Sequence, residues 1–307
     1  ETIQPSDLRV LSNILGMEFD RSTAEIMEEG MIPMSMREGN RYLNVISRSK
    51  LRCVSLEEEY NDLGDYDLHW SMLRRVEQIY QEYKSDTGKF DFTDMIELFV
   101  NQGTGPALEI LIVDEAQDLT PLQWKQINIL KERAAKVWYA GDDDQCIHRW
   151  NGVDLHSFMN ACDNKVVLNK SYRVPATVFD LANDIVNRIH IRQEKKWSPR
   201  DEAGSVDFHM NWYDVNIDEG SWTIMARTNK ALNSIHNSLR DDGYLFERFG
   251  KSVISLELLE AMDVWERLAR GETASVGEIK KMYTYMPKSG DKALLKRAAA
   301  KTFDAVD

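Results

Sequence analysis

Apolar residues recur at helical spacing through the first third of the chain. From about Asp67 to Ser85 they return every three or four residues, which places them on one face of an amphipathic helix. Gly88 is well placed to end this helix, and a further helix is expected after Phe92. Ser6 is expected to cap a first short helix. The pattern therefore predicts that the chain opens with a helical part.

The pattern changes at Glu109, where short apolar runs replace the helical spacing. Residues 110–113 are continuously apolar, as is typical of a buried parallel strand. Residues 137–140 predict a second strand and residues 166–168 a third. Between the first two strands, the string at 120–123 has the threonine, proline and glutamine of a capped helix start.

The alternation of strands and helices continues after Pro175, which is expected to open another helix, and a lobe boundary is expected after Pro199. Alternating strands and helices favour an α/β fold in which helices cover both faces of a parallel sheet. The further elements expected are strands at 206–208 and 222–225, a helix from about 230 to 240, and a helix from about 256. On the last helix, five apolar residues are in register: Leu258, Leu259, Met262, Trp265 and Leu268.

Composition indicates a globular chain of about two domains. The sequence has 307 residues, of which 43% are hydrophobic and 29% are charged. The net charge of −13 argues against a protein that simply coats DNA, because such proteins are usually basic, but it allows a motor that grips a strand in one local groove. No apolar run approaches the ~18 residues of a membrane span, and Glu1–Leu8 does not form a signal peptide.

The three cysteines, Cys53, Cys146 and Cys162, are scattered and odd in number. No disulfide framework is therefore expected, and a cytoplasmic location fits. Together with His148 and His156, two of these cysteines suggest a zinc site, but their spacing matches no paired C-x-x-C pattern. We therefore do not expect zinc.

The sharpest motif is the Asp-Glu-Ala-Gln-Asp string at 114–118, directly after the first predicted strand. In open α/β sheets, ligands bind beyond the carboxyl ends of the strands. Asp114 offers the oxygen ligands that Mg²⁺ prefers, and Glu115 could orient and deprotonate a water molecule. The alternative is that the two carboxylates only begin an exposed loop.

A second polar string, Gly-Asp-Asp-Asp-Gln at 141–145, follows the second predicted strand. Three successive aspartates repel one another unless they are solvated or paired with cations. Gln145 could sense a phosphate oxygen through its amide, and Trp150 offers a face for stacking on a nucleic-acid base. The alternatives are an acidic turn and a tryptophan that belongs to the core.

A third string, residues 168–175, ends just before a predicted helix and contains Arg173. A guanidinium group at this place could neutralise the charge of a phosphate during its transfer. The alternative is a surface arginine with a solvated partner.

In this order the three strings resemble motifs II, III and IV of the UvrD/Rep-type superfamily 1 helicases. The resemblance covers roughly residues 66–268. It implies a P-loop NTPase fold with RecA-like parallel-sheet lobes and helical insertions, an ATP-dependent helicase activity with Mg²⁺, and single-stranded DNA as the partner. Weaker matches to the family lie at residues 70–89, 90–95, 224–229 and 243–260.

The resemblance also implies a role for each matching residue at the nucleotide. Asp114 would hold Mg²⁺ with Glu115 beside it, and Glu115 would also be the general base. Gln145 and Arg173 would contact the γ-phosphate, and Tyr172 would stack on the adenine.

On the DNA side, the resemblance implies that Phe92 and Trp150 stack on bases and that His148 and Arg227 contact the strand. His148 stands where the family often has a tyrosine. Asn151 stands where it often has an arginine, which removes one ion pair of the family pattern.

The phosphate-binding loop of such a helicase, G-x-x-x-x-G-K-[ST], does not occur in the 307 residues. Residues 250–252 supply Gly-Lys-Ser, but Leu245 stands where the first glycine belongs, and residues 87–90 lack the final hydroxyl. The last two motifs of the family are also not found. The chain is therefore expected to begin after the phosphate loop and to end inside the insertion of the second lobe.

The predicted parts are a helical subdomain at 1–89, part of a first lobe at 90–170, part of a second lobe at 171–254 and the start of a helical insertion at 255–307. The predicted function is part of a monomeric ATP-dependent helicase that moves 3′ to 5′ on single-stranded DNA and meets replication or repair proteins. Two alternatives stay open: the motor part of a helicase–nuclease, and a non-catalytic module that binds single strands or a replication protein.

Overall fold

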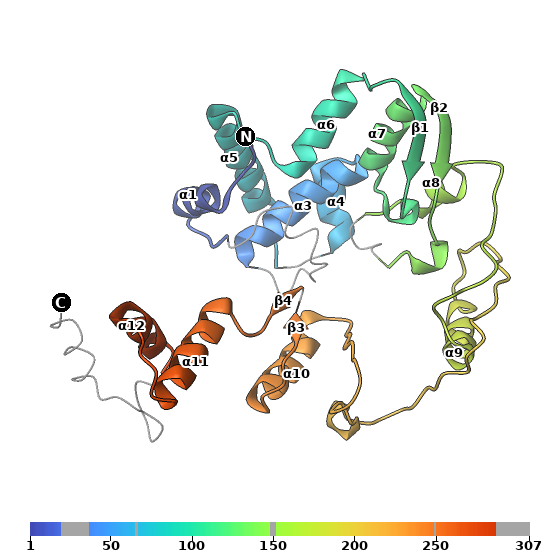
Figure 1. Ribbon diagram of the computed structural model, residues 1–307. Helices are drawn as coiled ribbons and strands as arrows, with labels where there is room; N and C mark the ends of the chain where they lie inside the picture. Colours follow the sequence, from blue (N-terminus) through green and yellow to red (C-terminus); the bar gives the residue numbers. More distant parts are fainter. Residues whose placement is uncertain (20–36, 65–66, 148–151, 249, 287–307) are drawn as a thin grey trace. The chain divides into compact units, whose positions relative to one another are not determined.

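The computed structural model describes residues 1–19, 37–64, 67–147, 152–248 and 250–286 (Figure 1). The chain divides into two compact units, Glu1–Val215 and Asn216–Asp307.

The first unit begins with the predicted helical part, whose main core is formed by residues of α1, α3 and α5. Gly88 ends the long amphipathic helix in the left-handed conformation at φ 63°, as expected for a glycine in this place. The predicted cap at Ser6 is wrong: Gln4 is the cap and Pro5 takes the first helical position, which suits its fixed φ. The helices are α1 (Pro5–Leu15), α3 (Glu38–Arg52), α4 (Leu56–Leu63), α5 (Trp70–Thr87) and α6 (Phe92–Gln102).

Buried charges connect these helices. Glu59 is fully buried on α4 and forms ion pairs with Arg48, at 2.9 Å, and with Arg52, both on α3. Lys84, buried near the end of α5, binds Asp91 at 2.9 Å and Asp94 at 2.6 Å. A buried charge is tolerated only when it is paired, so these contacts fix how α5 meets α6.

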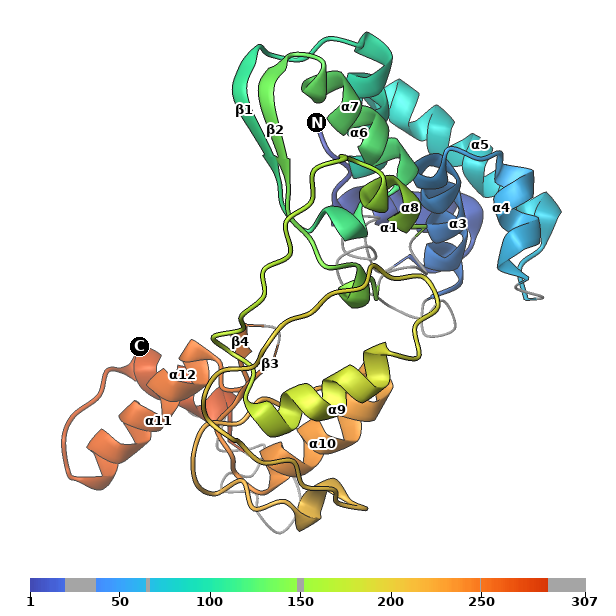
Figure 2. The ribbon, with the colours of Figure 1, turned by 90° about the vertical axis from the view of Figure 1, so that its right-hand side faces the viewer.

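A small parallel sheet follows, made of β1 (Leu108–Val113) and β2 (Ala134–Tyr139), with α7 (Pro121–Lys131) between them in sequence and packed beside them (Figures 1 and 2). The register pairs Val113 with Tyr139. The first two predicted strands, their parallel pairing and the capping box at the start of α7 are thus confirmed.

The expected burial of this sheet on both faces is wrong. One face packs on α7 through Val113 and Trp124, whereas Ile112 and Trp138 on the other face are exposed. Among the described residues, no helix covers that outer face.

The third strand expected at 166–168 is not formed, nor are the strands expected at 206–208 and 222–225. Val166 and Leu168 are 88% and 87% exposed. An extended segment becomes a strand only when a neighbour accepts and donates its ladder hydrogen bonds, and no described segment does so here. Lys170 and Ser198 form a single parallel bridge. The structure is therefore mostly helical, with a small parallel sheet in place of two full lobes.

The remaining elements of the first unit are short or lie at its surface. They are the 3₁₀ turns η2 (Ala116–Asp118), η3 (Asp143–Gln145) and η5 (Trp212–Asp214), and the helices α8 (Leu155–Met159) and α9 (Ala176–Val186).

The described elements of the second unit are three helices and one short pair of strands. The helix expected from about residue 256 is confirmed as α11. Its packed face contains Ala261 and Val264, which contact α12, whereas Leu259, Met262 and Trp265 are about half exposed. No helix in the described part of the chain is long and apolar enough to cross a membrane. The elements are α10 (Asn229–Asp241), β3 (Glu247–Arg248) antiparallel to β4 (Lys251–Ser252), α11 (Leu256–Ala269) and α12 (Val276–Thr284).

Candidate functional site

The polar strings at 114–118 and 141–145 leave the same edge of the β1–β2 sheet. Asp114 follows β1, and Gln145 lies in η3 after β2. Because the two strands are parallel neighbours, their carboxyl ends meet at one edge. Backbone hydrogen bonds connect the two segments there: the amide of Ala140 donates to Val113 at 2.8 Å, and that of Ala116 donates to Ala140 at 2.9 Å. The parallel pairing thus brings Asp114 and Gln145 to one edge of the sheet.

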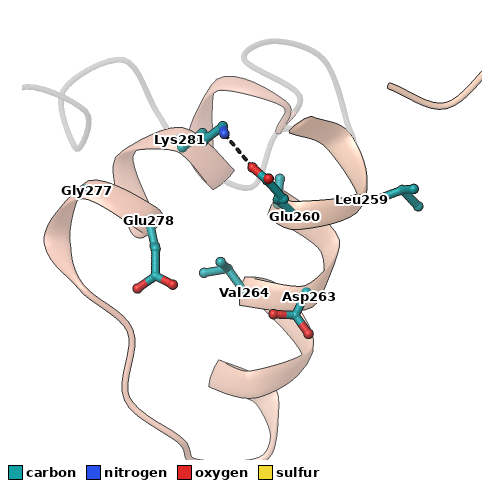
Figure 3. A pocket seen from close by; sticks show the side chains of 8 residues that line it. Leu259, Glu260, Asp263, Val264, Gly277, Glu278 and Lys281 are labelled. Atoms are coloured by element: carbon teal, nitrogen blue, oxygen red, sulfur yellow. Dashed lines mark hydrogen bonds and ion pairs between the residues drawn. The ribbon is translucent and has the colours of Figure 1, made fainter. Parts of the chain in front are cut away.

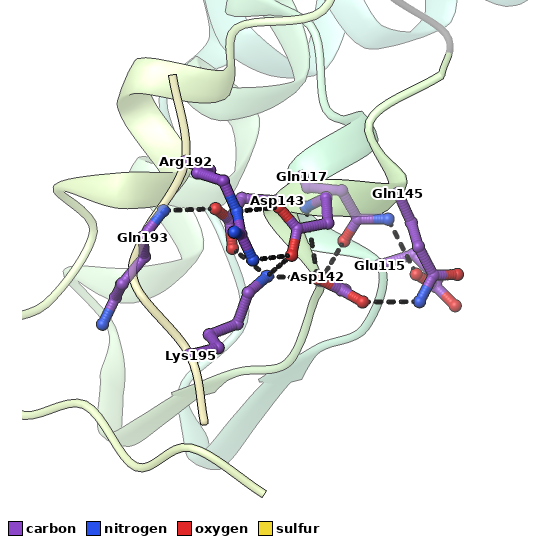
Figure 4. A network of polar contacts seen from close by, with 9 residues as sticks. Glu115, Gln117, Asp142, Asp143, Gln145, Arg192, Gln193 and Lys195 are labelled. Atoms are coloured by element: carbon purple, nitrogen blue, oxygen red, sulfur yellow. Dashed lines mark hydrogen bonds and ion pairs between the residues drawn. The ribbon is translucent and has the colours of Figure 1, made fainter. Parts of the chain in front are cut away.

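Gln117 joins the two strings through its side chain (Figure 4). Its amide nitrogen donates to Glu115 Oε2 at 2.8 Å and to Asp118 Oδ2 at 3.2 Å, and its amide oxygen accepts a bond of 3.0 Å from the backbone nitrogen of Asp142. Only 1% of Gln117 is exposed, so these bonds are made away from water. Gln117 therefore sets the position of the Glu115 carboxylate relative to the second string.

Glu115 has a left-handed backbone at φ 50° and ψ 39°, which is uncommon for a residue with a β-carbon. Its amide donates to Asp114 Oδ1 at 3.0 Å, and its carbonyl accepts from Asp118 at 3.0 Å. Such a conformation costs roughly 1–3 kcal/mol, and residues of this kind cluster at functional sites. The turn keeps both Asp114 and Glu115 exposed at the sheet edge.

The three successive aspartates at 142–144 are paired with cations, as their repulsion requires. Lys195 contacts all three carboxylates, including Asp143 at 2.6 Å and Asp144 at 3.0 Å. Arg192 grips Asp144 with two bonds of 2.8 Å (Figure 4). The segment that follows α9 is thereby fastened to the loop that follows β2.

These contacts favour the charged forms of Asp142, Lys195 and Arg192. Burial raises the pKa of Asp142, but the hydrogen bonds from Lys195 and Gln145 outweigh it and hold that pKa below its ordinary value. Burial lowers the pKa of Lys195, but the three carboxylates outweigh it and leave that pKa raised. The hydrogen bond to Asp144 is the main reason why the pKa of Arg192 is raised.

Tyr172 and Arg173, from the third string, do not join this edge. Tyr172 is 86% exposed, and Arg173 is exposed too. Within the described residues, no hydrogen bond or ion pair joins either side chain to Asp114 or Gln145. The strand expected at 166–168, which would have placed these two residues at the sheet edge, is not formed. The backbone amide of the adjacent Ser171 instead donates to the carbonyl of Ser198 at 2.8 Å.

The structure describes two of the four predicted DNA contacts, one in each unit. Phe92 begins α6 and is 48% exposed. Arg227 is exposed just before Thr228, the cap of α10 in the second unit. His148 and Trp150 lie outside the described residues.

Sequence reasoning missed Gln117, Arg192 and Lys195. The signal for Gln117 was its place inside the 114–118 string. For Arg192 and Lys195, the signal was the run of three aspartates, because adjacent carboxylates are stabilised by cations. The sequence does not identify which lysine or arginine pairs with them.

A carboxylate at this edge fits a magnesium ion. Mg²⁺ is usually held by one or two carboxylates together with water and phosphate oxygens. Asp114 is exposed, and its Oδ1 accepts one bond from the Glu115 amide. The described residues give Oδ2 no hydrogen-bond partner, so it is available to a cation. No group of three or more His, Cys, Asp and Glu side chains in the described part could form a metal site of protein ligands alone.

A pocket of about 580 Å³ between α11 and α12 does not suit a nucleotide (Figure 3). Glu260, Asp263 and Glu278 line it, and its lysine, Lys281, is already paired with Glu260 at 2.5 Å. Three carboxylates repel a phosphate, so this pocket is not a second candidate for the site.

Three curated helicases are similar to parts of the chain. The Rep ATP-dependent DNA helicase of Buchnera aphidicola is 23% identical over 256 residues, which is 78% of this chain and 37% of that protein. The PcrA ATP-dependent DNA helicase of Leuconostoc citreum is 25% identical over 199 residues, which is 53% of this chain and 27% of that protein. DNA helicase II of Haemophilus influenzae is 28% identical over 166 residues, which is 50% of this chain and 22% of that protein.

The chain thus spans between about a fifth and about two fifths of the length of these relatives. The sequence profile of the UvrD/REP helicase N-terminal domain matches residues 8–165, which is just over half of the chain and includes both polar strings of the sheet edge. The chain belongs to the UvrD/REP helicase family.

Proposed function

We propose that this chain is part of an ATP-dependent helicase that moves along single-stranded DNA in the 3′ to 5′ direction. The observation that supports this most is the sheet edge, where Asp114, Glu115 and Gln145 emerge together and Gln117 links their loops. Membership of the family and the order of the motifs support ATP and Mg²⁺ as the cofactors.

At the nucleotide, Asp114 holds Mg²⁺, with Glu115 as a second carboxylate beside it. When bound, Mg²⁺ neutralises phosphate charge. Glu115 orients the attacking water and takes its proton, because its carboxylate is exposed and Gln117 fixes its direction. Gln145 contacts the γ-phosphate through its amide.

Tyr172 and Arg173 complete the proposed nucleotide site from the second lobe. Tyr172 stacks on the adenine, and Arg173 neutralises charge at the γ-phosphate. Both side chains are exposed in this structure, so they are accessible to a ligand. The proposed organisation keeps two RecA-like lobes, at 90–170 and 171–254, with a helical subdomain before them and a helical insertion after them.

On the DNA, Phe92, His148, Trp150 and Arg227 contact a single strand. In a polypeptide that also contains a phosphate-binding loop, we expect Trp150→Ala to weaken single-strand binding by ~1–3 kcal/mol with little preference among bases, because stacking tolerates every base. Fluorescence anisotropy with labelled oligonucleotides measures this. Unchanged affinity together with a large loss of stability would place Trp150 in the core instead.

The role of Glu115 tests the proposed chemistry. In a polypeptide with a phosphate-binding loop, Glu115→Gln keeps the shape of the side chain but removes the base. We expect ATP hydrolysis to fall by ~10²–10⁴-fold while nucleotide binding is largely kept. Asp118→Asn is the matched control, because Asp118 shares the Gln117 amide but has no role as a base. Wild-type turnover in Glu115→Gln would remove Glu115 from the mechanism.

A non-catalytic module that binds single strands or a replication protein is the second candidate. The observation that favours it is that the 307 residues contain no G-x-x-x-x-G-K-[ST] string. The nucleotide sequence upstream of the codon for Glu1 separates the two candidates: a phosphate loop encoded in frame there favours the motor. A nuclease domain encoded in the same frame would make the parent a helicase–nuclease.

A further inference from the structure

Asp142 is held from two sides at the edge of the sheet. Lys195 donates to its Oδ1, and the Gln145 amide nitrogen donates to its Oδ2 at 2.6 Å (Figure 4). The backbone nitrogen of Asp142 donates to Gln117 Oε1 at 3.0 Å. One residue thus connects a cation from the segment after α9 with two amide side chains of the site.

The bond that Gln145 donates to Asp142 decides which way the Gln145 amide faces. An ionised carboxylate only accepts hydrogen bonds, so the NH₂ side of Gln145, and not its oxygen, must lie against Asp142. An NH₂ group has two donors, and one is used here. The second donor remains available to a phosphate oxygen, which is the contact that the proposed function requires of Gln145.

The backbone of Asp142 has the corresponding effect on Glu115. Because Asp142 donates to the oxygen of Gln117, the amide nitrogen of Gln117 must face the other way, where it donates to Glu115 at 2.8 Å. A shift of Asp142 would therefore disturb Gln145 and Glu115 together.

We propose that Lys195 is a positioning residue for the nucleotide site: by clamping Asp142, it orients the amide of Gln145 and, through Gln117, the carboxylate of Glu115. This inference rests on the proposed function for the roles of Gln145 and Glu115. The side chain of Lys195 is 15% exposed, and its ammonium group contacts Asp142, Asp143 and Asp144.

A lysine suits this position better than the nearby arginine. An ammonium group is a compact charge with three donors that rotate, and three carboxylates surround it here. Arg192 instead uses its planar fork on Asp144 and a further bond of 3.1 Å to Asn187. Arg192 therefore anchors the segment, while Lys195 reaches the aspartate that orients the amides.

The experiment uses this chain without nucleotide or DNA. Heteronuclear NMR follows the titration of the Asp142 carboxyl and the side-chain amide signals of Gln145 in the wild type, in Lys195→Met and in Lys195→Arg. Lys196→Met is the matched control, because Lys196 is the neighbouring residue and is exposed.

In the wild type we expect the pKa of Asp142 to lie below the ordinary aspartate value. In Lys195→Met we expect it to rise, because burial then acts without its main opposing cation. The amide protons of Gln145 should exchange faster with water in that variant. Lys195→Arg should restore part of both effects, and Lys196→Met should show neither.

An ordinary pKa for Asp142 in the wild type overturns the inference, and this result does not depend on any variant folding. So does an equal response of Lys195→Met and Lys196→Met. Failure of the proposed function is a separate result: it would appear as a lack of ATP hydrolysis in a polypeptide with a phosphate loop, and would leave the titration unchanged.

Discussion

The buried amide of Gln117 shows how one residue can organise this site. Its two donors and its oxygen are all used, and each bond reaches a residue at the sheet edge. A buried amide that loses such partners costs ~1–3 kcal/mol, which is larger than the net gain from an average hydrogen bond. The site is therefore sensitive to small changes in the space around Gln117.

Gly141 provides a test of that sensitivity. A β-carbon at this position would lie 2.4 Å from Gln117 Oε1 and 2.9 Å from Phe158 Cζ, so Gln117 or Phe158 must move. We expect Gly141→Ala to destabilise the chain by ~1–3 kcal/mol, the usual cost of overpacking. Urea unfolding measures it.

The control for this variant is Gly277→Ala in the first turn of α12. A β-carbon there meets nothing closer than Ser275 Oγ at 4.0 Å. A compatible glycine-to-alanine change stabilises by ~0.4–1 kcal/mol. Equal behaviour of the two variants would contradict the role given to the space around Gln117.

Single residues were predictable where the signal was local. Asp114 and Gln145 belong to polar strings that each directly follow an apolar run, and such strings mark the ends of strands. Lys195 could not be found, because it lies 53 residues from Asp142 in sequence and only the path of the chain brings them together. Glu115 was identified as a candidate because it is a carboxylate that follows a strand, but the sequence does not show that its backbone is left-handed.

At the scale of elements, helices were predicted better than strands. The spacing that places α5 and the string that caps α7 are local properties, so they identify those helices without knowledge of the rest of the chain. The strand expected at 166–168 needs a partner from elsewhere, and no described segment supplies one. The outer face of β1 and β2 is exposed for a similar reason. The apolar residues of these strands would allow burial, but no described helix covers that face.

The stability of α12 is predicted to depend on pH through Glu278. The backbone and side chain of Ser275, followed by Arg267, lower the pKa of Glu278 from 4.5 to about 2. A carboxyl whose pKa falls on folding stabilises the fold above its unfolded value, and that contribution is lost as the pH falls through its folded value. We therefore expect α12 to lose stability as the pH drops from 4.5 to about 2.

Glu278→Gln should remove this part of the pH dependence, as measured by urea unfolding across that range. Glu266→Gln is the control, because Glu266 is also paired with an arginine, Arg270, but caps no helix. If the free energy of unfolding depended on pH in the same way in the wild type and in Glu278→Gln, Glu278 would not contribute to the pH dependence through the capping box that it forms with Ser275.

For the whole molecule, the structure represents the predicted first lobe better than the predicted second lobe. The family profile matches residues 8–165, and those residues contain the parallel sheet and the edge that carries Asp114 and Gln145. Beyond them the described chain has helices, extended segments and the short β3–β4 pair, but not the strands expected at 166–168, 206–208 and 222–225. The net charge of −13 means that any grip on DNA comes from a few local side chains and not from the surface as a whole.

The most direct test of the central claim is whether single-stranded DNA controls ATP hydrolysis through this sheet edge. Phosphate release is measured with and without an oligonucleotide, for a polypeptide that contains these residues and a phosphate-binding loop, and for the 307-residue chain alone. For the polypeptide with a phosphate-binding loop, we predict ATP turnover within the usual ~1–1000 per second, and we expect it to rise when DNA is added. For the 307-residue chain alone, we predict no turnover. ATP hydrolysis by the 307-residue chain alone, or a turnover that does not change when DNA is added, would contradict the proposed DNA-dependent ATP hydrolysis.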